Sequence, residues 1–231
     1  RTAPISDPAM PSLSRPSGLV HLGAACARSG RRGAIVLATC LATCPVGPAL
    51  AASVEVLVQD GAGKPLPGAA VFLESKEARA ASRPAAGVDI VQSARQFQPR
   101  VTVVTVGTAV SFPNRDTVRH HVYSFSPVKK FEIKLYVGTP AAPVVFDQPG
   151  IAALGCNIHD TMAAWVVVVE TPHHALTGAD GRAQLAQVPA GSYRLRTWHP
   201  ALPPGAPALD QAVQLAAANL ALTVPMAGLQ P

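Results

Sequence analysis

The sequence is poor in charged and in aromatic residues. Only 14% of its 231 residues are Asp, Glu, Lys or Arg, and only 5% are Phe, Trp or Tyr. An average soluble domain carries about 25% charged residues. A glycan-binding surface needs a platform of exposed aromatic rings, and two Trp and three Tyr are a thin supply for one. The composition therefore argues against a carbohydrate-binding function.

Cysteine is scarce as well, and three of the four cysteines lie within the first 44 residues. Cys156 is the only one beyond them. A single cysteine cannot form a disulfide framework within the chain, and the C-x-x-C-H motif of covalent haem attachment is absent. A reactive free thiol is a liability in an oxidising compartment. Metal ligation by Cys156 would remove that liability.

Long apolar runs are also missing. The longest candidate, residues 34–44, has 11 residues, whereas a membrane-spanning helix needs about 20. It follows a basic flank and precedes the small-residue sequence Ala-Leu-Ala at 49–51, which is the pattern of a secretory signal peptide. The basic residues of the flank are Arg28, Arg31 and Arg32. We expect residues 1–51 to be a leader and the protein to be periplasmic, with lipid anchoring at Cys40 or Cys44 as the alternative.

The positive charge of the chain is concentrated in that leader. The formal net charge is +6, but residues 1–51 hold five of the 19 basic and one of the 13 acidic residues. The remainder carries 14 Lys and Arg against 12 Asp and Glu, and it has no basic stripe. Nucleic-acid binding is therefore excluded as an interpretation of the high isoelectric point.

The rest of the chain has the pattern of an all-β protein. Apolar and polar residues alternate in short runs separated by turn clusters, as in a β-sandwich or barrel. Residues 53–75 read as a hairpin, and residues 76–87, which have no period, read as a linker or loop. The segment near 210–224 has a helix-like composition, but we interpret it as two strands that close a sheet.

Cys156, His159 and Met162 form a C-x2-H-x2-M motif that fits in one tight loop between two strands. With a second histidine, from His120 or His121 upstream, they make the donor set of a blue-copper site, which has two His, one Cys and a weak axial Met. A structural zinc site prefers four Cys or His ligands, so the Met argues against zinc. A buried, inert Cys with a core Met is the simplest alternative.

The stretch VTVVTVGTAVSFPNRDTVRHHVYSF, followed downstream by GCNIHDTM, resembles the plastocyanin/azurin family of cupredoxins, and its short ligand loop is similar to the amicyanin type. The resemblance implies a Greek-key β-sandwich with one copper ion. It implies the ligands His120, Cys156, His159 and Met162. The family aromatic residue two positions before the Cys is replaced here by Leu154, which bears on the potential more than on the metal.

Two adjacent histidines compete for the upstream ligand position. Cupredoxins usually read His-Asn-Val there, so the sequence HHV places His120 on the ligand and His121 beside it, bracing the ligand loop. Strand alternation favours His121 instead, because alternation puts His121 on the same face of the strand as Tyr123 and Phe125, two residues that favour a buried position. We prefer His120 as the ligand. Asn114 is expected to shape the turn before this strand.

Two flanking segments, VQDGAGKPLPGAAVFL and TGADGRAQLAQVPAGSYRLRTWHP, resemble the two ends of a carboxypeptidase-regulatory-like (transthyretin-like) β-sandwich. We therefore predict an all-β chain in which a cupredoxin sandwich, residues 88–170, is inserted into a small sandwich made of residues 53–82 and 171–226. The arrangement also resembles chains called methylamine utilization proteins, a label that names a gene neighbourhood more than a chemistry.

These patterns predict a periplasmic type 1 copper protein that transfers single electrons and has no substrate of its own. The expected partner is a periplasmic redox protein such as a cytochrome c or a dehydrogenase. The alternative function is a copper-holding or copper-delivery protein, or an accessory binding module of a periplasmic dehydrogenase system. Paired carboxylates, phosphate-binding glycine loops and nucleophile triads in a plausible context are absent from the sequence.

Overall fold

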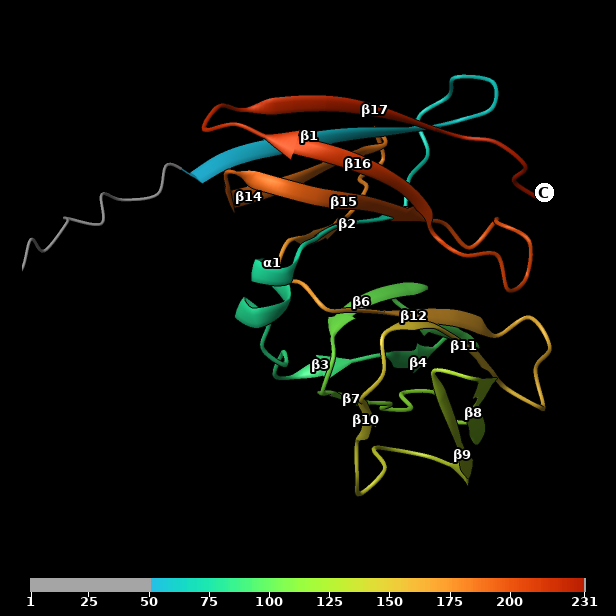
Figure 1. The fold of residues 1–231 in the computed structure, drawn as a ribbon. Helices are drawn as coiled ribbons and strands as arrows, with labels where there is room; N and C mark the ends of the chain where they lie inside the picture. The colour runs from blue at the N-terminus through green and yellow to red at the C-terminus, as the bar shows by residue number, and fades with distance from the viewer. Residues whose placement is uncertain (1–50, 231) are drawn as a thin grey trace, which may run out of the picture. The chain divides into compact units, whose positions relative to one another are not determined.

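The computed structural model describes residues 51–230, which belong to one compact unit. The expected leader lies outside the described residues, apart from Ala51. The described chain contains seventeen strands and one helix, and the strands fall into the two groups seen in Figure 1. No helix in this part of the chain has the length and apolar character needed to cross a membrane.

The first group of strands is formed by the two ends of the described chain. One sheet has the order β14-β1-β17, with bounds Arg182–Pro189, Ala51–Asp60 and Leu220–Met226. A second sheet has the order β13-β2-β15-β16, with bounds His174–Leu176, Ala70–Glu74, Gly191–Trp198 and Leu209–Leu215. Every second residue of β1 from Ala52 to Val58 is buried, as the alternating sequence requires. The two strands expected near 210–224 are confirmed as β16 and β17. The hairpin expected over residues 53–75 is wrong, because β1 and β2 lie in different sheets and do not pair with each other.

The second group is formed by residues 88–169. Its main sheet has the order β6-β12-β11-β8-β9, with bounds Val101–Thr105, Ala163–Val169, Gly150–Gly155, His120–Ser126 and Lys129–Tyr136. A smaller sheet has the order β10-β7-β3, with bounds Val144–Phe146, Thr108–Ser111 and Val88–Asp89. The hairpin β4-β5, Val91–Ser93 and Gln96–Gln98, completes the group. The all-β fold class, a Greek-key sandwich inserted between the parts of a smaller one, is confirmed.

The valine run of β12 is explained by burial on both faces of the main sheet. Ala164, Val166 and Val168 belong to the core that also contains Cys156. Val167 and Val169 belong to the core built mainly by the terminal strands. A strand buried on both faces carries a continuous apolar sequence in place of an alternating one. β12 thus contributes side chains to both hydrophobic cores.

The expectation of an irregular linker over residues 76–87 is wrong for its first half. Lys76–Ala81 form the helix α1, which begins after Ser75. The Ser75 side chain accepts a hydrogen bond from the Ala78 backbone NH at 3.0 Å, as an N-cap residue does. The sequence KEARAA has good helix formers after a capping Ser, and this signal outweighs the lack of an apolar period over so short a segment.

Gly181 carries the tightest backbone approach of the terminal sheets, and this gives a prediction. Its φ is +72°, and a Cβ there would lie 2.7 Å from the Val58 backbone oxygen and 2.9 Å from the Leu66 backbone nitrogen. We expect Gly181→Ala to lower the free energy of unfolding by roughly 2–5 kcal/mol, since the left-handed conformation costs about 1–2 kcal/mol and overpacking about 1–3 kcal/mol. Chemical denaturation measures the change.

Gly63→Ala is the matched control. Gly63 has a similar φ of +80°, but a Cβ there would meet no atom within 4 Å. It should lose only the conformational part, roughly 1–2 kcal/mol. Equal losses in the two variants would show that the close backbone contact at Gly181 contributes nothing.

Candidate metal centre

The C-x2-H-x2-M motif is the connection between β11 and β12. The two strands pair antiparallel up to Gly155 opposite Ala163, so residues 156–162 form the entire turn between them. The second half of the turn is held by a hydrogen bond of 2.9 Å from the Met162 backbone NH to the His159 carbonyl. Cys156 leaves one strand and Met162 leads into the next, which places both side chains at the same end of the sheet.

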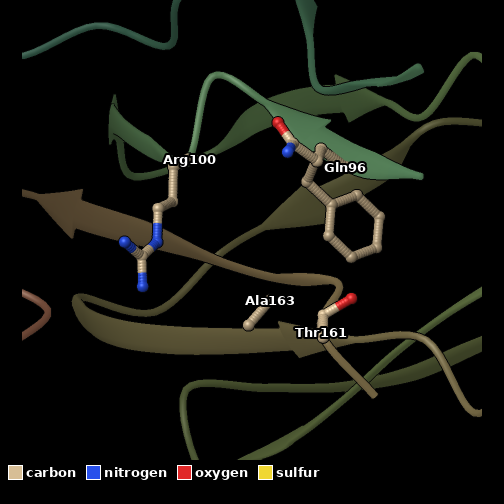
Figure 2. Close-up of a pocket in the computed structure, with 5 residues that line it drawn as sticks. Gln96, Arg100, Thr161 and Ala163 are labelled. Atoms are coloured by element: carbon tan, nitrogen blue, oxygen red, sulfur yellow. The ribbon is translucent and has the colours of Figure 1, made fainter. Parts of the chain in front are cut away.

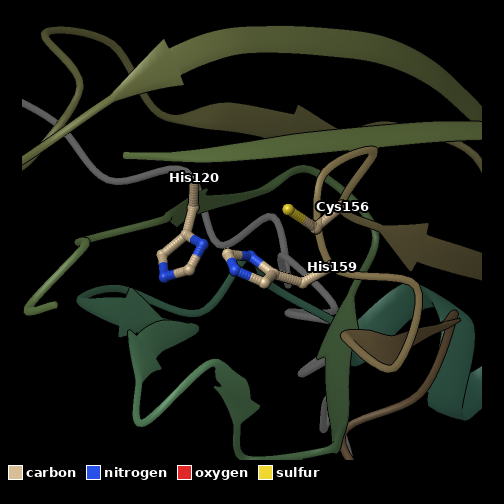
Figure 3. A group of neighbouring side chains, drawn as sticks. All are labelled: His120, Cys156 and His159. Atoms are coloured by element: carbon tan, nitrogen blue, oxygen red, sulfur yellow. The ribbon is translucent and has the colours of Figure 1, made fainter. Parts of the chain in front are cut away.

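His120 reaches this end of the sheet from the neighbouring strand. β8 begins at His120 and pairs with β11 through Tyr123 opposite Gly155. One potential ligand atom from each of His120, Cys156 and His159 lies within 4.8 Å of the other two (Figure 3). The two imidazole rings meet edge to face, with their centroids 5.0 Å apart. Residues that are 36 and 39 positions apart along the chain thus converge on one point.

The free ring nitrogens show which atoms of the histidines are available to a metal. The Nε2 atom of His120 lies 2.7 Å from the Asp116 carboxylate, whereas its buried Nδ1 atom has no hydrogen-bond partner. The Nδ1 atom of His159 is also buried and without a partner. A buried nitrogen without a partner is costly unless something binds it. Two such atoms beside one thiol fit a metal ion bound through both Nδ1 atoms and the sulfur.

The sulfur atoms of the motif lie in the interior. Cys156 is 3% exposed and is the free cysteine of the described residues, and Met162 is 2% exposed in the same apolar core. His120 is fully buried and His159 is half-buried. A buried thiol beside two imidazoles, with a buried thioether in the same core as the thiol, offers the donors that copper accepts in both of its oxidation states. The residues present therefore fit copper.

His121 lies apart from this group. Its Nδ1 atom is also buried without a hydrogen-bond partner, but its Nε2 atom is 3.0 Å from a Glu132 carboxylate oxygen and its ring packs on the Tyr123 ring with centroids 5.6 Å apart. The alternation argument that favoured His121 as the ligand rested on a wrong premise, because Phe125 is 74% exposed and Tyr123 is half-buried. The buried residues of β8 beyond the histidines are Val122 and Ser124, so the core lies on the face opposite to the aromatic residues.

Asn114 organises the loop that leads to His120. Its side-chain amide donates to the Val118 carbonyl at 2.9 Å and to the Tyr136 carbonyl at 2.8 Å. Its side-chain oxygen accepts a hydrogen bond of 3.0 Å from the Asp116 backbone NH. The residue thereby sets the course of the loop over 114–118. It thereby supports both Asp116 and Tyr136, the residue of β9 that pairs with His120.

Asp116, which the sequence analysis did not single out, contacts the candidate ligand His120. Hydrogen bonds from the Arg95 backbone NH and then from the His120 ring hold the pKa of Asp116 below its usual value. A carboxylate beside the outer nitrogen of a ligand histidine is a common arrangement at metal sites. The Asp four residues before His120 was the available signal.

A pocket of about 320 Å³ lies beside the loop of residues 156–162 but is separate from the candidate ligands. It is lined by Gln96, Phe97, Arg100, Thr161 and Ala163 (Figure 2). The Arg100 guanidinium lies over the Trp165 ring, 5.1 Å from its centroid. Since none of the four candidate ligands lines it, this hollow has no part in holding a metal.

Comparison with known proteins gives remote structural likenesses. No protein-family model matches the sequence, and no curated protein matches it. The chain is similar to a purple cupredoxin from Nitrosopumilus maritimus, with 21% identity, a TM-score of 0.33, and coverage of 36% of this chain and 100% of that one. It is similar to a reduced Cu(I) form of an amicyanin variant, with 20% identity, a TM-score of 0.34, and coverage of 43% and 98%.

A third likeness is to the Cu-containing nitrite reductase of Thermus scotoductus. Here the identity is 20% and the TM-score 0.34, and the likeness covers 48% of this chain and 28% of that one. Likenesses this remote carry no functional argument. The chemistry of the centre is therefore inferred from the side chains of this chain alone.

Proposed function

We propose that the protein is a type 1 copper protein that transfers single electrons. The observation that carries the proposal is the convergence of His120, Cys156 and His159 within 4.8 Å, with both Nδ1 atoms buried and unpartnered. Met162, buried in the core that also contains Cys156, is the proposed weak axial ligand. Two imidazoles, one thiolate and one thioether define this class of copper site.

A copper ion in such a set would supply a one-electron couple between Cu(II) and Cu(I). The chain contributes a fixed geometry. Cys156 and Met162 are anchored at the two ends of a seven-residue turn, beside the paired strands β11 and β12, and a backbone hydrogen bond joins His159 and Met162 within the turn. His120 is held through its outer nitrogen by Asp116. Donors that are held in place need not rearrange when the charge of the ion changes, which suits electron transfer.

Burial of the donors favours electron transfer over copper delivery. His120, Cys156 and Met162 are each 3% exposed or less, and His159 is half-buried. A delivery protein must release its ion to an acceptor, which requires ligands that an acceptor can reach. In this site His159 is the ligand that solvent reaches, so we propose its ring edge as the route by which electrons enter and leave.

We further propose that the protein works in the periplasm, as an electron carrier and not as an enzyme, with a redox protein such as a cytochrome c or a dehydrogenase as its partner. The leader pattern in residues 1–51 supports export. The nearly balanced charge of the remaining residues is consistent with a soluble carrier, because no large basic field competes with partner recognition.

A spectrum of the Cu(II)-loaded protein and of two histidine variants tests the function. The wild type should bind one copper per chain and show an intense blue band from thiolate-to-Cu(II) charge transfer. His120→Ala should lose the blue band, because it removes a ligand nitrogen from the interior. His121→Asn should keep it, because the His121 ring pairs with Glu132 and not with the ligand group.

Absorption and electron paramagnetic resonance spectra measure these outcomes, with metal analysis giving the copper content. A colourless Cu(II) form of the wild type would remove the electron-transfer proposal and favour delivery. Retention of zinc in preference to copper at full occupancy would remove the copper assignment. Loss of the blue band in His121→Asn but not in His120→Ala would reverse the ligand assignment.

A further inference from the structure

The hairpin β4-β5 turns through two residues with an unusual backbone. Ala94 has a φ of +53° and Arg95 a φ of +57°, both in the left-handed region. Two-residue hairpin turns of this kind favour Asn-Gly, since other side chains are strained there. Neither Ala nor Arg has an intrinsic reason to adopt it. Something outside the turn must hold it in place.

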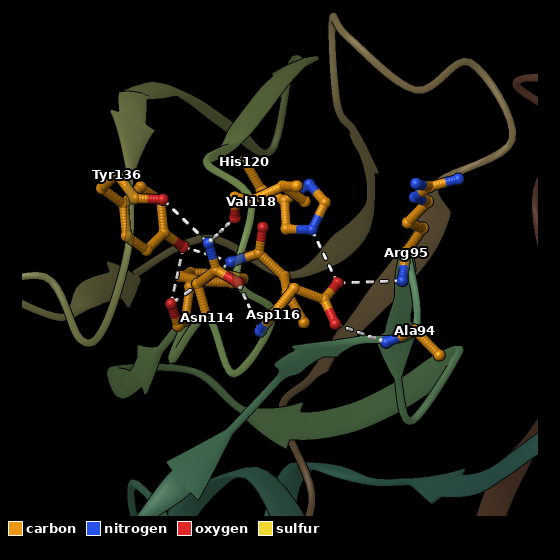
Figure 4. Close-up of polar contacts among 9 residues, drawn as sticks. Ala94, Arg95, Asn114, Asp116, Val118, His120 and Tyr136 are labelled. Atoms are coloured by element: carbon orange, nitrogen blue, oxygen red, sulfur yellow. Dashed lines mark hydrogen bonds and ion pairs between the residues drawn. The ribbon is translucent and has the colours of Figure 1, made fainter.

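That outside contact is the Asp116 carboxylate. The backbone NH groups of Ala94 and Arg95 donate to its two oxygens at 2.7 Å and 2.9 Å. The oxygen bonded to Arg95 also lies 2.7 Å from the Nε2 atom of His120 (Figure 4). The left-handed turn is what aims both NH groups at one carboxylate. Three groups thus converge on Asp116 from two segments that are far apart in sequence.

The hairpin is also fastened to the loop that carries Asp116. The Gln92 backbone NH donates to the Pro113 carbonyl, and the Arg115 backbone NH donates to the Gln92 carbonyl, both at 2.8 Å. Gln92 itself is fully buried. With Asn114 holding the other side of the loop, Asp116 has little freedom to move. A carboxylate held this firmly can fix the orientation of the ring that it contacts.

We propose that Asp116, clamped by the Ala94–Arg95 turn, is a positioning residue for the copper centre. It keeps the proton of His120 on Nε2 and directs the Nδ1 lone pair towards Cys156 and His159. The inference rests on the proposed copper function and deepens it. It also assigns a role to the β4-β5 hairpin, which contributes no ligand of its own. The hairpin fixes the Asp116 carboxylate, and this carboxylate fixes the His120 ring.

The test compares two histidine–carboxylate pairs in the full chain. Asp116→Asn places an amide against His120, and its NH2 group can donate to Nε2, which favours a proton on Nδ1. We expect Cu(II) affinity to fall by about 10- to 100-fold, the usual effect of losing such a partner. Glu132→Gln makes the same chemical change at the His121 pair. It should leave copper affinity and the blue band unchanged.

Nitrogen NMR of the His120 ring in the metal-free protein gives a readout independent of copper. In the wild type it should report a proton on Nε2 and a free Nδ1, and in Asp116→Asn a shift towards the Nδ1–H form. Asp116→Glu retains a carboxylate and should restore the wild-type form. A wild-type His120 that carries its proton on Nδ1 would overturn the inference, whether or not Asp116→Asn folds.

A second pair of substitutions separates positioning from support of the hairpin. Ala94→Asn with Arg95→Gly gives the turn a sequence that favours its conformation without help from Asp116. Added to Asp116→Asn, it should leave copper affinity low, because the loss arises at His120. Recovery of wild-type affinity would show that Asp116 only supports the turn, and would overturn the inference.

Failure of the copper function has a different signature. In one case the wild type binds no copper, but His120 carries its proton on Nε2 and shifts it towards Nδ1 in Asp116→Asn. The proposed copper function then fails, and the positioning role of Asp116 stands. If the wild type binds copper and Asp116→Asn binds it equally well, the function stands and the inference fails.

Discussion

Replacing Cys156 by Ser is expected to abolish the blue copper centre entirely. The thiolate is the source of the charge-transfer colour, and a Ser hydroxyl is a poor substitute because it stays protonated and is a hard donor. The two unpartnered Nδ1 atoms would remain, so weak and colourless Cu(II) binding should persist. Absorption and resonance spectra of the Cu(II)-titrated variant measure both effects.

Cys156→Ala is the control that separates a ligand from a core residue. Both variants lose the metal centre, but Ser also leaves a hydroxyl at a position that is only 3% exposed. In the metal-free protein we expect Ser to cost roughly 1–3 kcal/mol for an unsatisfied buried group, and Ala about 1 kcal/mol for lost apolar burial. If Cys156 is only a small core residue, these stability losses appear but copper affinity stays at the wild-type value.

The ligand loop could be predicted from sequence because its information is local. Three donors at fixed spacing between two strand patterns leave few ways to fold, and the structure places them in one hairpin turn. The choice between His120 and His121 was less secure, because it depends on the face that each residue of β8 presents. The register of β8 against β9 shifts between His120 and Val122, so simple alternation does not hold there.

The clamp on Asp116 had no sequence signal strong enough to find it. The turn at Ala94 and Arg95 lacks the Gly or Asn that usually marks left-handed residues, so the hairpin over 91–98 is not predicted. Its conformation is fixed by hydrogen bonds to a loop about twenty residues away. Long-range contacts of this kind override local preference. They become evident only when the whole sheet is assembled.

The apolar face of β12 gives the second large prediction. We propose that residues 88–170 are a copper domain inserted between the two parts of the terminal sandwich, with bounds 53–82 and 171–226. A fragment of residues 83–172 keeps the contacts of Arg83 and Ala85 to Thr105 and Thr108. It should fold and bind copper, because it retains the core around Cys156. It should also self-associate at micromolar concentrations, which light scattering measures.

The physical reason for self-association is the second face of the main sheet. The residues of this face that pack in the terminal core are Val101, Val103, Ile151, Trp165, Val167 and Val169. In the fragment they lie on the surface together, and contiguous apolar patches of this kind mark interaction sites or aggregation liabilities. The hydrogen bonds between its strands remain, so the fragment keeps its fold, but the terminal strands that bury this face are gone.

The double substitution Val167→Thr with Val169→Thr should reduce self-association of the fragment but destabilise the full chain. Thr has nearly the shape of Val and favours strands, so the substituted fragment should remain folded and become monomeric. In the full chain the same hydroxyls lie at positions 1% and 0% exposed, and each should cost roughly 1–3 kcal/mol. A fragment that stays unfolded and binds no copper even with both Thr residues would show that the copper domain depends on the terminal sandwich for its stability. A wild-type fragment that is already monomeric would show that the shared face of β12 needs no cover.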